Sequence, residues 1–344
     1  MQQDTAMGEK HSRQLGEQRF WYWRGWRIRY TYVASFMMVG SGSSGSSGSF
    51  MEKPAAAVNH EAPLLLLHGA GSSLAQWRES LAQWQQEQLA PPPLRGGIAQ
   101  SRPVYALDLV GFGGSEKIAA ELNTDLWVAQ VAAFWQTFLR RPMMLMGHSL
   151  GASVALQMAT THPEKVSRLV MLTLPAARQE IGGQAAKLGA VVEGWFASPV
   201  LVRSLFRLIR KPNLIRSVLR KLHQDPSRVD DDLVDGFVRP TLERGAARTF
   251  CYLVKSRTSE RFCPQTRDLI PLLQVPTLLL WGTHDRVIPI AWGRYVNTLS
   301  AQLTFVEIEN AGHFFYDERP NELHDLLLRW VANELPVTND NLVT

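Results

Sequence analysis

Short runs of apolar residues alternate along this chain with longer segments in which apolar residues recur at helical spacing. Apolar runs too short to form a helix are typical of strands that are buried on both faces of a sheet. Helical segments between such strands connect them in parallel. We expect strands at 63–67, 103–109, 143–146, 166–174, 276–282 and 303–308, and helices at 77–89, 125–139 and 322–335. The pattern therefore predicts an α/β fold with a mostly parallel central sheet and helices on both faces.

Three segments near the start depart from this alternation. Residues 1–19 are polar, and we expect them to be disordered. Residues 20–33 alternate aromatic and basic side chains around Gly25, which is typical of a hairpin of two short strands. Arginines in this pattern also occur in nucleic-acid binding, but alternation on an outer hairpin accounts for them. Residues 40–50 have the Gly/Ser composition of a flexible linker.

The sheet pattern is interrupted between the fourth and fifth expected parallel strands. Residues 176–268 show helical periodicity and no convincing strand, so we expect a helical lid over the carboxyl ends of the strands, where such sheets bind ligands. The predicted organisation is a disordered 1–19, a first core part at 20–175, the lid at 176–268, a second core part at 269–335 and a tail at 336–344.

Composition excludes several classes of protein. With 45% hydrophobic and 19% charged residues, the 344-residue chain is typical of a soluble globular protein. A net charge of +5 is modest, and no block of basic residues interleaved with aromatics predicts nucleic-acid binding. Cys251 and Cys263 are too few for a disulfide framework, which favours a reducing compartment. No apolar run approaches the length of a membrane span, and the acidic N-terminus resembles no signal peptide, so we expect a cytoplasmic protein.

The strand at 143–146 leads into Gly147-His148-Ser149-Leu150-Gly151, and an Ala-rich helical segment follows. Gly-x-Ser-x-Gly between a strand and a helix is the nucleophile elbow, a strained turn that exposes the serine. The flanking glycines are needed because the two backbones pass too close for a Cβ atom. The pattern predicts Ser149 as a nucleophile, with the helix N-terminus directed at charge that develops beside it.

A nucleophilic serine needs a base, and the base needs an acid to orient it. In chains with this elbow the acid and then the histidine follow the serine. His313 lies in a loop just after a strand, whereas His324 lies within a helix, where we expect it on a solvated face. Asp285 follows directly on a strand end, whereas Asp108 precedes the serine and is expected to hold its own loop. We therefore predict Ser149, Asp285 and His313 as the catalytic residues.

The oxyanion formed during acyl transfer requires two N–H donors. We predict the backbone N–H groups of Leu150 and Ala70, since Ala70 lies in a glycine-bearing turn at the end of the first parallel strand. The turn at 110–115 is also glycine-rich, but it lacks the Lys-Ser/Thr ending of a phosphate loop. No cofactor and no metal site are predicted.

Together these motifs resemble those of the α/β-hydrolase family. The resemblance rests on His68-Gly69-x-Gly71, Asp108-x-x-Gly111-Phe112-Gly113-x-Ser115, Gly147-His148-Ser149-x-Gly151, Asp285 and Gly312-His313. Members of this fold that act as haloalkane dehalogenases or epoxide hydrolases carry an aspartate in place of Ser149. A finer resemblance is to the pheophytinase and chlorophyll-dephytylase-like hydrolases of plants and cyanobacteria. That resemblance rests on Trp23-Arg24-Gly25 with Ile28-x-Tyr30, on Gln76-Trp77-Arg78, and on the segments at 229–234 and 239–246.

The resemblance implies hydrolysis of a carboxylic ester through an acyl-serine, with a bulky apolar substrate such as the phytyl ester of chlorophyll or pheophytin. Hydrolysis of a carbon–carbon bond or a thioester would use the same residues. A receptor of the same fold, which binds a small molecule and signals through a partner, is a further alternative. The absence of a transit-peptide pattern favours a bacterial protein of the cyanobacterial type.

Within the expected lid, residues 200–222 combine basic and apolar residues at helical spacing. One interpretation is a helix pair with one face on the core and a solvated basic face. The other is peripheral docking on an anionic membrane, the thylakoid in a cyanobacterium.

Overall fold

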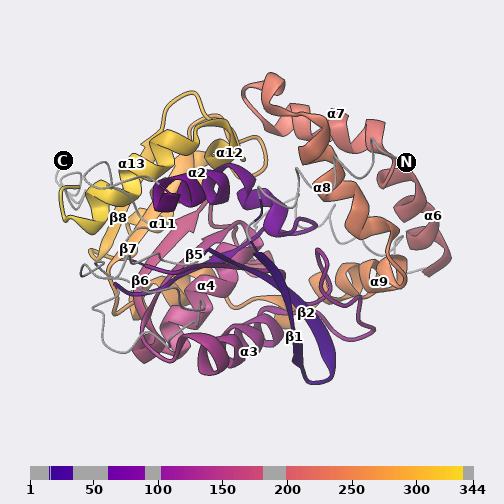
Figure 1. The fold of residues 1–344 in the computed structure, drawn as a ribbon, viewed down its shortest axis with the longest axis horizontal. Helices are drawn as coiled ribbons and strands as arrows, with labels where there is room; N and C mark the ends of the chain where they lie inside the picture. The colour runs from indigo at the N-terminus through magenta and orange to yellow at the C-terminus, as the bar shows by residue number, and fades with distance from the viewer. Residues whose placement is uncertain (1–14, 16, 34–60, 90–101, 181–198, 336–344) are drawn as a thin grey trace, which may run out of the picture.

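The computed structural model describes residues 15, 17–33, 61–89, 102–180 and 199–335. They build one eight-stranded sheet in the order β1-β2-β4-β3-β5-β6-β7-β8 (Figure 1). The strands β1 and β2 pair antiparallel, as do β2 and β4, and all other neighbours are parallel. The strands are β1 (Glu17–Trp23), β2 (Trp26–Val33), β3 (Leu64–Leu67), β4 (Val104–Leu107), β5 (Met143–His148), β6 (Val166–Leu172), β7 (Thr277–Gly282) and β8 (Leu303–Ile308).

The central strands are apolar because both of their faces are covered. Every residue of β3, β5 and β7 is buried. Alternate residues along a strand belong to two separate core clusters, as the two-residue repeat of a strand requires: Leu65 packs in one cluster, and Leu64 and Leu66 pack in the other. The register Leu67↔Gly147 brings the carboxyl ends of β3 and β5 together, so the loops that follow them are neighbours.

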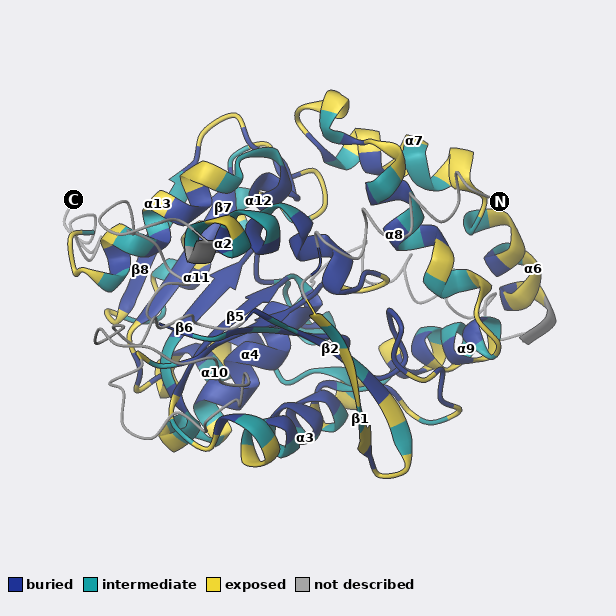
Figure 2. Ribbon diagram, in the orientation of Figure 1, coloured by how far each residue is buried: buried dark blue, intermediate teal, exposed yellow. Residues whose placement is uncertain are grey.

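Helices cover both faces of the sheet (Figure 2). One core cluster takes side chains from α3, α4 and α11, and the other takes side chains from α2, α12 and α13. These helices are α2 (Arg78–Leu89), α3 (Thr124–Phe134), α4 (Leu150–Thr161), α11 (Ile290–Asn297), α12 (Phe315–Glu318) and α13 (Pro320–Val331). The predicted α/β architecture is confirmed.

Between β6 and β7 the described residues contain helices and no strand. We call residues 199–272 the insertion. Its helices α6 to α9 lie side by side beyond the end of the sheet at which β5 meets α4 (Figure 1). Their bounds are α6 (Pro199–Ile209), α7 (Pro212–Leu222), α8 (Asp231–Leu242) and α9 (Ala246–Arg257), and the short α10 (Thr266–Leu269) follows them. The helical character predicted for this part of the chain is therefore found.

Several predicted boundaries change. Strand β1 begins at Glu17, inside the range expected to be disordered, and Leu15 before it is almost fully buried. The hydroxyl of Thr31 on β2 donates to the backbone carbonyl of Leu15, so pairing with β2 orders residues whose own sequence is polar. The sequence did not predict α11. The Gly/Ser segment at 40–50 and the tail at 336–344 lie outside the described residues.

Two expectations from composition can be compared with the described residues. Cys251 and Cys263 are not joined in a disulfide. In the part of the chain that the structure describes, no helix is both long enough and apolar enough to cross a membrane.

Candidate active site

Ser149 lies on a strained turn between β5 and α4. Its backbone has φ 51° and ψ −117°, a conformation that a residue with a Cβ rarely adopts. The turn is tight on both sides. A Cβ on Gly147 would lie 2.2 Å from the carbonyl oxygen of Gly151, and a Cβ on Gly151 would lie 2.3 Å from that of Leu67. Both flanking glycines are therefore required by close backbone approach, as the pattern predicts.

Asp285 and His313 are in contact, as predicted. Atom Nδ1 of His313 lies 2.7 Å from Oδ2 of Asp285, and both side chains are buried. The other carboxylate oxygen of Asp285 accepts from the amides of Val287 at 2.7 Å and Ile288 at 2.9 Å. These bonds fix the carboxylate, so it accepts from Nδ1–H and leaves Nε2 as the basic atom of the His313 ring.

Three contacts place the loop that carries His313. A Cβ on Gly282, at the end of β7, would lie 2.4 Å from the carbonyl oxygen of Ala311, so glycine allows the two loops to touch. The backbone N–H of His313 donates to the carbonyl of Leu222 at the end of α7. Atom Nε2 of His148 lies 3.1 Å from the carbonyl oxygen of His313, and the two rings are 4.6 Å apart. The histidine is thus held against the elbow from one side and by the insertion from the other.

Ser149 and His313 line the same cavity, with a volume of about 900 Å³. Ala70 lines it from the turn after β3. Most of its remaining wall is apolar and comes from the insertion and from the loop after β7. The apolar lining residues from these two parts are Phe206, Ile209, Leu214, Ile215, Val218, Leu219, Leu222, Phe237, Phe250, Val287, Ile288, Pro289 and Trp292.

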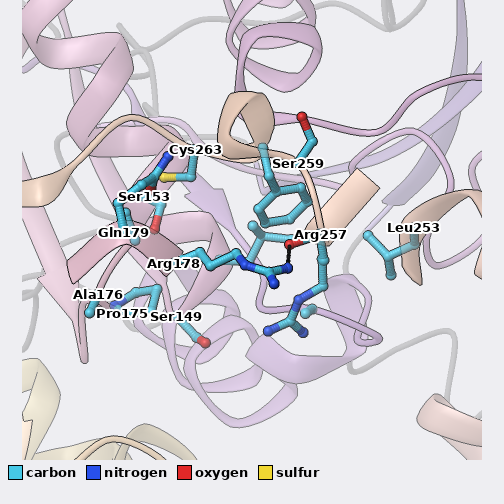
Figure 3. Close-up of a pocket in the computed structure, with 14 residues that line it drawn as sticks. Ser149, Ser153, Pro175, Ala176, Arg178, Gln179, Leu253, Arg257, Ser259 and Cys263 are labelled. Carbon is cyan, nitrogen blue, oxygen red and sulfur yellow. Dashed lines mark hydrogen bonds between the residues drawn. The ribbon is translucent and has the colours of Figure 1, made fainter. Parts of the chain in front are cut away.

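Ser149 also lines a second, smaller cavity of about 180 Å³ (Figure 3). Its lining is more polar and includes Ser153, Gln179 and two arginines, Arg178 and Arg257. Figure 3 shows the side chain of Arg178 extending toward Arg257, whose backbone carbonyl accepts from it at 3.4 Å. Ser149 therefore lines a large, mainly apolar cavity and a smaller one with a more polar lining.

The predicted oxyanion donors also lie beside Ser149. Leu150 is the first residue of α4, where backbone N–H groups have no partner within the helix. Among the described residues, no backbone carbonyl accepts from the N–H of Ala70 or Leu150. The turn that carries Ala70 is held by Gln76, whose side-chain oxygen accepts from the N–H of Gly69 at 2.9 Å. Both donors thus come from fixed backbone, although no sequence signal had given Gln76 this positioning role.

Two buried histidines near the site are held in the neutral form. Burial, reinforced by the neighbouring His313, lowers the pKa of His148 well below its usual range. Burial also lowers the pKa of His68, although nearby Asp108 opposes this effect. Atom Nε2 of His68 accepts from the N–H of Leu109 at 3.1 Å, which requires that this nitrogen carry no proton.

Asp108 and His324, the alternatives to Asp285 and His313, each have other partners in the structure. Asp108 holds its own loop, as predicted, by accepting from the N–H of Gly114 at 2.7 Å, and it also pairs with Arg29. The solvated position expected for His324 is wrong. His324 is buried, its Nδ1 accepts from Trp84, and its Nε2 lies 3.1 Å from Glu87. A helical residue can therefore be polar in type and still face the core.

Comparisons with known proteins agree with this fold. A family model described as alpha/beta hydrolase fold matches residues 62–320. The 2-hydroxymuconate semialdehyde hydrolase of Pseudomonas sp. (strain CF600) is 28% identical over 236 residues, which are 66% of this chain and 72% of that protein. The chloroplastic pheophytinase of Arabidopsis thaliana is 26% identical over 65% of this chain, and the match spans about half (48%) of that relative's length. A crystal structure of a membrane phospholipase A superposes with a TM-score of 0.67 at 23% identity, covering 97% of this chain and 91% of that one.

Proposed function

The chain belongs to the alpha/beta hydrolase fold family, and from that premise we propose that it cleaves a carboxylic ester through an acyl-serine intermediate. The observation that carries the proposal is the arrangement around the large cavity. A strained Ser149 and a His313 oriented by Asp285 open onto the same apolar space. An alcohol nucleophile and an oriented imidazole that open onto one cavity are the arrangement that acyl transfer requires.

In the proposed first step, the Ser149 hydroxyl attacks the ester carbonyl while Nε2 of His313 takes its proton. Asp285 stabilises the imidazolium that forms, and the N–H groups of Ala70 and Leu150 stabilise the negative oxygen. The intermediate collapses, the alcohol leaves with the proton from His313, and an acyl-serine remains. A water molecule, for which the small polar cavity offers space, then attacks with His313 as base and releases the acid.

The proposed substrate is a bulky apolar ester, with the phytyl ester of chlorophyll or pheophytin as the leading candidate. The large cavity has room for a long chain, and its wall is mainly apolar. Burying each CH₂ group of a chain contributes about 0.8 kcal/mol, so a branched chain of this length would bind strongly. The similarity to a pheophytinase supports the candidate, and the similarity to a 2-hydroxymuconate semialdehyde hydrolase favours carbon–carbon bond hydrolysis as the second candidate.

The mechanism is tested with a fluorophosphonate probe, which reacts with an activated serine. Wild-type protein should be labelled, and Ser149→Ala should lose both labelling and esterase activity. Full activity in Ser149→Ala would exclude the mechanism. Steady turnover of an ester over many cycles would exclude the receptor alternative, because a receptor stops after binding or one cleavage.

The substrate is tested by incubating the protein with detergent-dispersed chlorophyll a and pheophytin a. We expect chlorophyllide or pheophorbide to appear together with free phytol. If short p-nitrophenyl esters turn over rapidly and neither pigment is cleaved, the pigment proposal is wrong while the serine mechanism stands. Turnover of a dienoate ring-cleavage product, without turnover of any ester, would support the carbon–carbon hydrolase instead.

A further inference from the structure

The outer helices of the insertion expose large apolar side chains. Leu201 and Leu208 on α6 are 55% and 50% exposed, and Val218 on α7 is 46% exposed. On α6, Val202 and Phe206 are buried against the rest of the protein, whereas the leucines are not. The apolar surface of this helix is therefore wider than the surface that is buried. Figure 2 shows this exposure along α6 and α7 at the periphery of the molecule. We call the exposed faces of α6 and α7 the outer face of the insertion.

The same two helices carry a one-sided charge. Residues 199–222 contain no aspartate or glutamate. Of their basic residues, Arg216 pairs with Asp231 on α8. The others are Arg203, Arg207, Arg210, Lys211, Arg220 and Lys221, and none forms a salt bridge with a described carboxylate. Exposed apolar residues among cations that have no salt bridge to a described carboxylate match the chemistry of an anionic lipid surface, which offers negative headgroups above an apolar interior.

The outer face adjoins the mouth of the large cavity. Leu214 and Val218 are exposed and also line that cavity, and so does Val287, which is 47% exposed, in the loop after β7. An apolar molecule lying at this surface would therefore contact side chains that also line the cavity of Ser149.

Another exposed apolar group lies on the β1–β2 hairpin, where Phe20 is 52% and Tyr22 69% exposed. The guanidinium of Arg27 lies over the ring of Phe20, 4.9 Å from its centroid, so that ring already has a cationic partner within the protein. No residue of the hairpin lines the large cavity. The hairpin is therefore a matched control with similar chemistry and no connection to the cavity.

We propose that the outer face of the insertion docks the protein on an anionic lipid bilayer, with the cavity mouth toward the lipid. The basic residues contact headgroups, the exposed leucines and valine enter the interfacial region, and apolar ligands pass into the cavity without crossing water.

Flotation with vesicles tests this proposal directly. The full chain is mixed with vesicles of phosphatidylcholine alone or of phosphatidylcholine with phosphatidylglycerol, at low and high salt. Binding is expected with the anionic vesicles, weakened by salt. The triple variant R203Q/R207Q/K211Q changes no residue that lines the cavity, and it should bind about a hundredfold more weakly, since each basic residue near the surface contributes roughly fivefold.

Two controls separate this face from general charge and hydrophobicity. The hairpin variant R19Q/R24Q/R27Q loses the same charge and should bind as wild type does. Leu201→Ser with Leu208→Ser should weaken binding, whereas Leu272→Ser, at a similarly exposed leucine away from the cavity, should not. Equal binding to neutral and anionic vesicles, no binding at all, or an equal loss in the hairpin variant would overturn the proposal. Flotation needs no turnover, so Ser149→Ala should float as wild type does whatever its activity.

Discussion

The sheet and the insertion differ in how completely their residues are buried. Strands β3, β5 and β7 are buried along their whole length, and glycines between them allow backbones to approach where no Cβ fits. Helices α6 and α7 of the insertion, in contrast, bury only part of their apolar surface and expose three leucines and one valine. Dense packing fixes positions closely, whereas a half-covered helix tolerates change. We therefore expect substitutions in the core to change the geometry of the site and substitutions in the insertion to change which ligands enter the cavity.

Ion pairs and hydrogen bonds join the two regions. The buried guanidinium of Arg78 on α2 pairs with Asp317 on α12 and with Asp230, the N-cap of α8. Lys117, in the loop after β4, pairs with Glu243 at the end of α8. The pairs Arg78–Asp230 and Lys117–Glu243 each link a residue of the core to a residue of the insertion.

The largest effect is expected at the histidine of the core site. His313→Ala should lower kcat by a factor on the order of several thousand, because the three residues act as a unit. The matched change is His324→Gln, at a histidine that is equally buried but bonded to Trp84. That variant should lose stability and keep kcat per folded molecule. Comparable loss of kcat in both would show that burial, and not position at the elbow, explains the effect.

Replacing a glycine by alanine should lower the free energy of unfolding more at the sheet than in the insertion. Gly147→Ala places a Cβ 2.2 Å from the carbonyl oxygen of Gly151, so we expect a loss of about 3 kcal/mol or more in the free energy of unfolding. Gly236→Ala, within α8, meets only the methyl of Ala75 at 3.0 Å and gains helix propensity. Its change should stay within about 1 kcal/mol. Urea denaturation of both variants gives the two values. Similar losses would show that Gly147 is no more constrained than Gly236.

Low pH should lower the free energy of unfolding, because the buried neutral histidines take up a proton less readily in the folded state. The folded-state pKa of His68 lies below the unfolded value, which is about 6.5, so the unfolded state binds the proton more readily. This contribution to stability is complete above that pH and is lost as pH falls from the unfolded pKa toward the folded one. The loss is at most about 1.4 kcal/mol per pH unit for one histidine. His68→Gln should reduce the slope of the free energy of unfolding against pH below 6.5. An unchanged slope would show that His68 does not contribute to this pH dependence.

The smallest effect is expected on substrate preference. Ile209 lines the large cavity, and Leu208 beside it does not and is 50% exposed. Ile209→Ala removes apolar contact with a long chain, so the ratio of kcat/KM for p-nitrophenyl palmitate to that for p-nitrophenyl acetate should fall about fivefold. Leu208→Ala should leave the ratio unchanged. The same ratio in both variants would show that long chains do not occupy this part of the cavity.

Much of the core could be predicted because its burial is symmetric. A strand that is covered on both faces is buried throughout, so β3 and β7 were predicted to within one residue of their bounds. Order at Leu15 and the helix α11 escaped prediction, because neither follows from local composition. Leu15 is buried only because β2 supplies its partner.

The sequence by itself determined the elbow, and it predicted the contact between Asp285 and His313. Gly147, Gly151 and the strained Ser149 follow from steric requirements within a few residues, and such requirements are visible in a local pattern. Only the tertiary structure decided that His324 is bonded to Trp84, 240 positions away, and that the insertion and the core enclose a cavity of about 900 Å³. The reason is physical: a side chain's partner and a cavity's volume depend on how separate elements pack, and no local pattern contains that information.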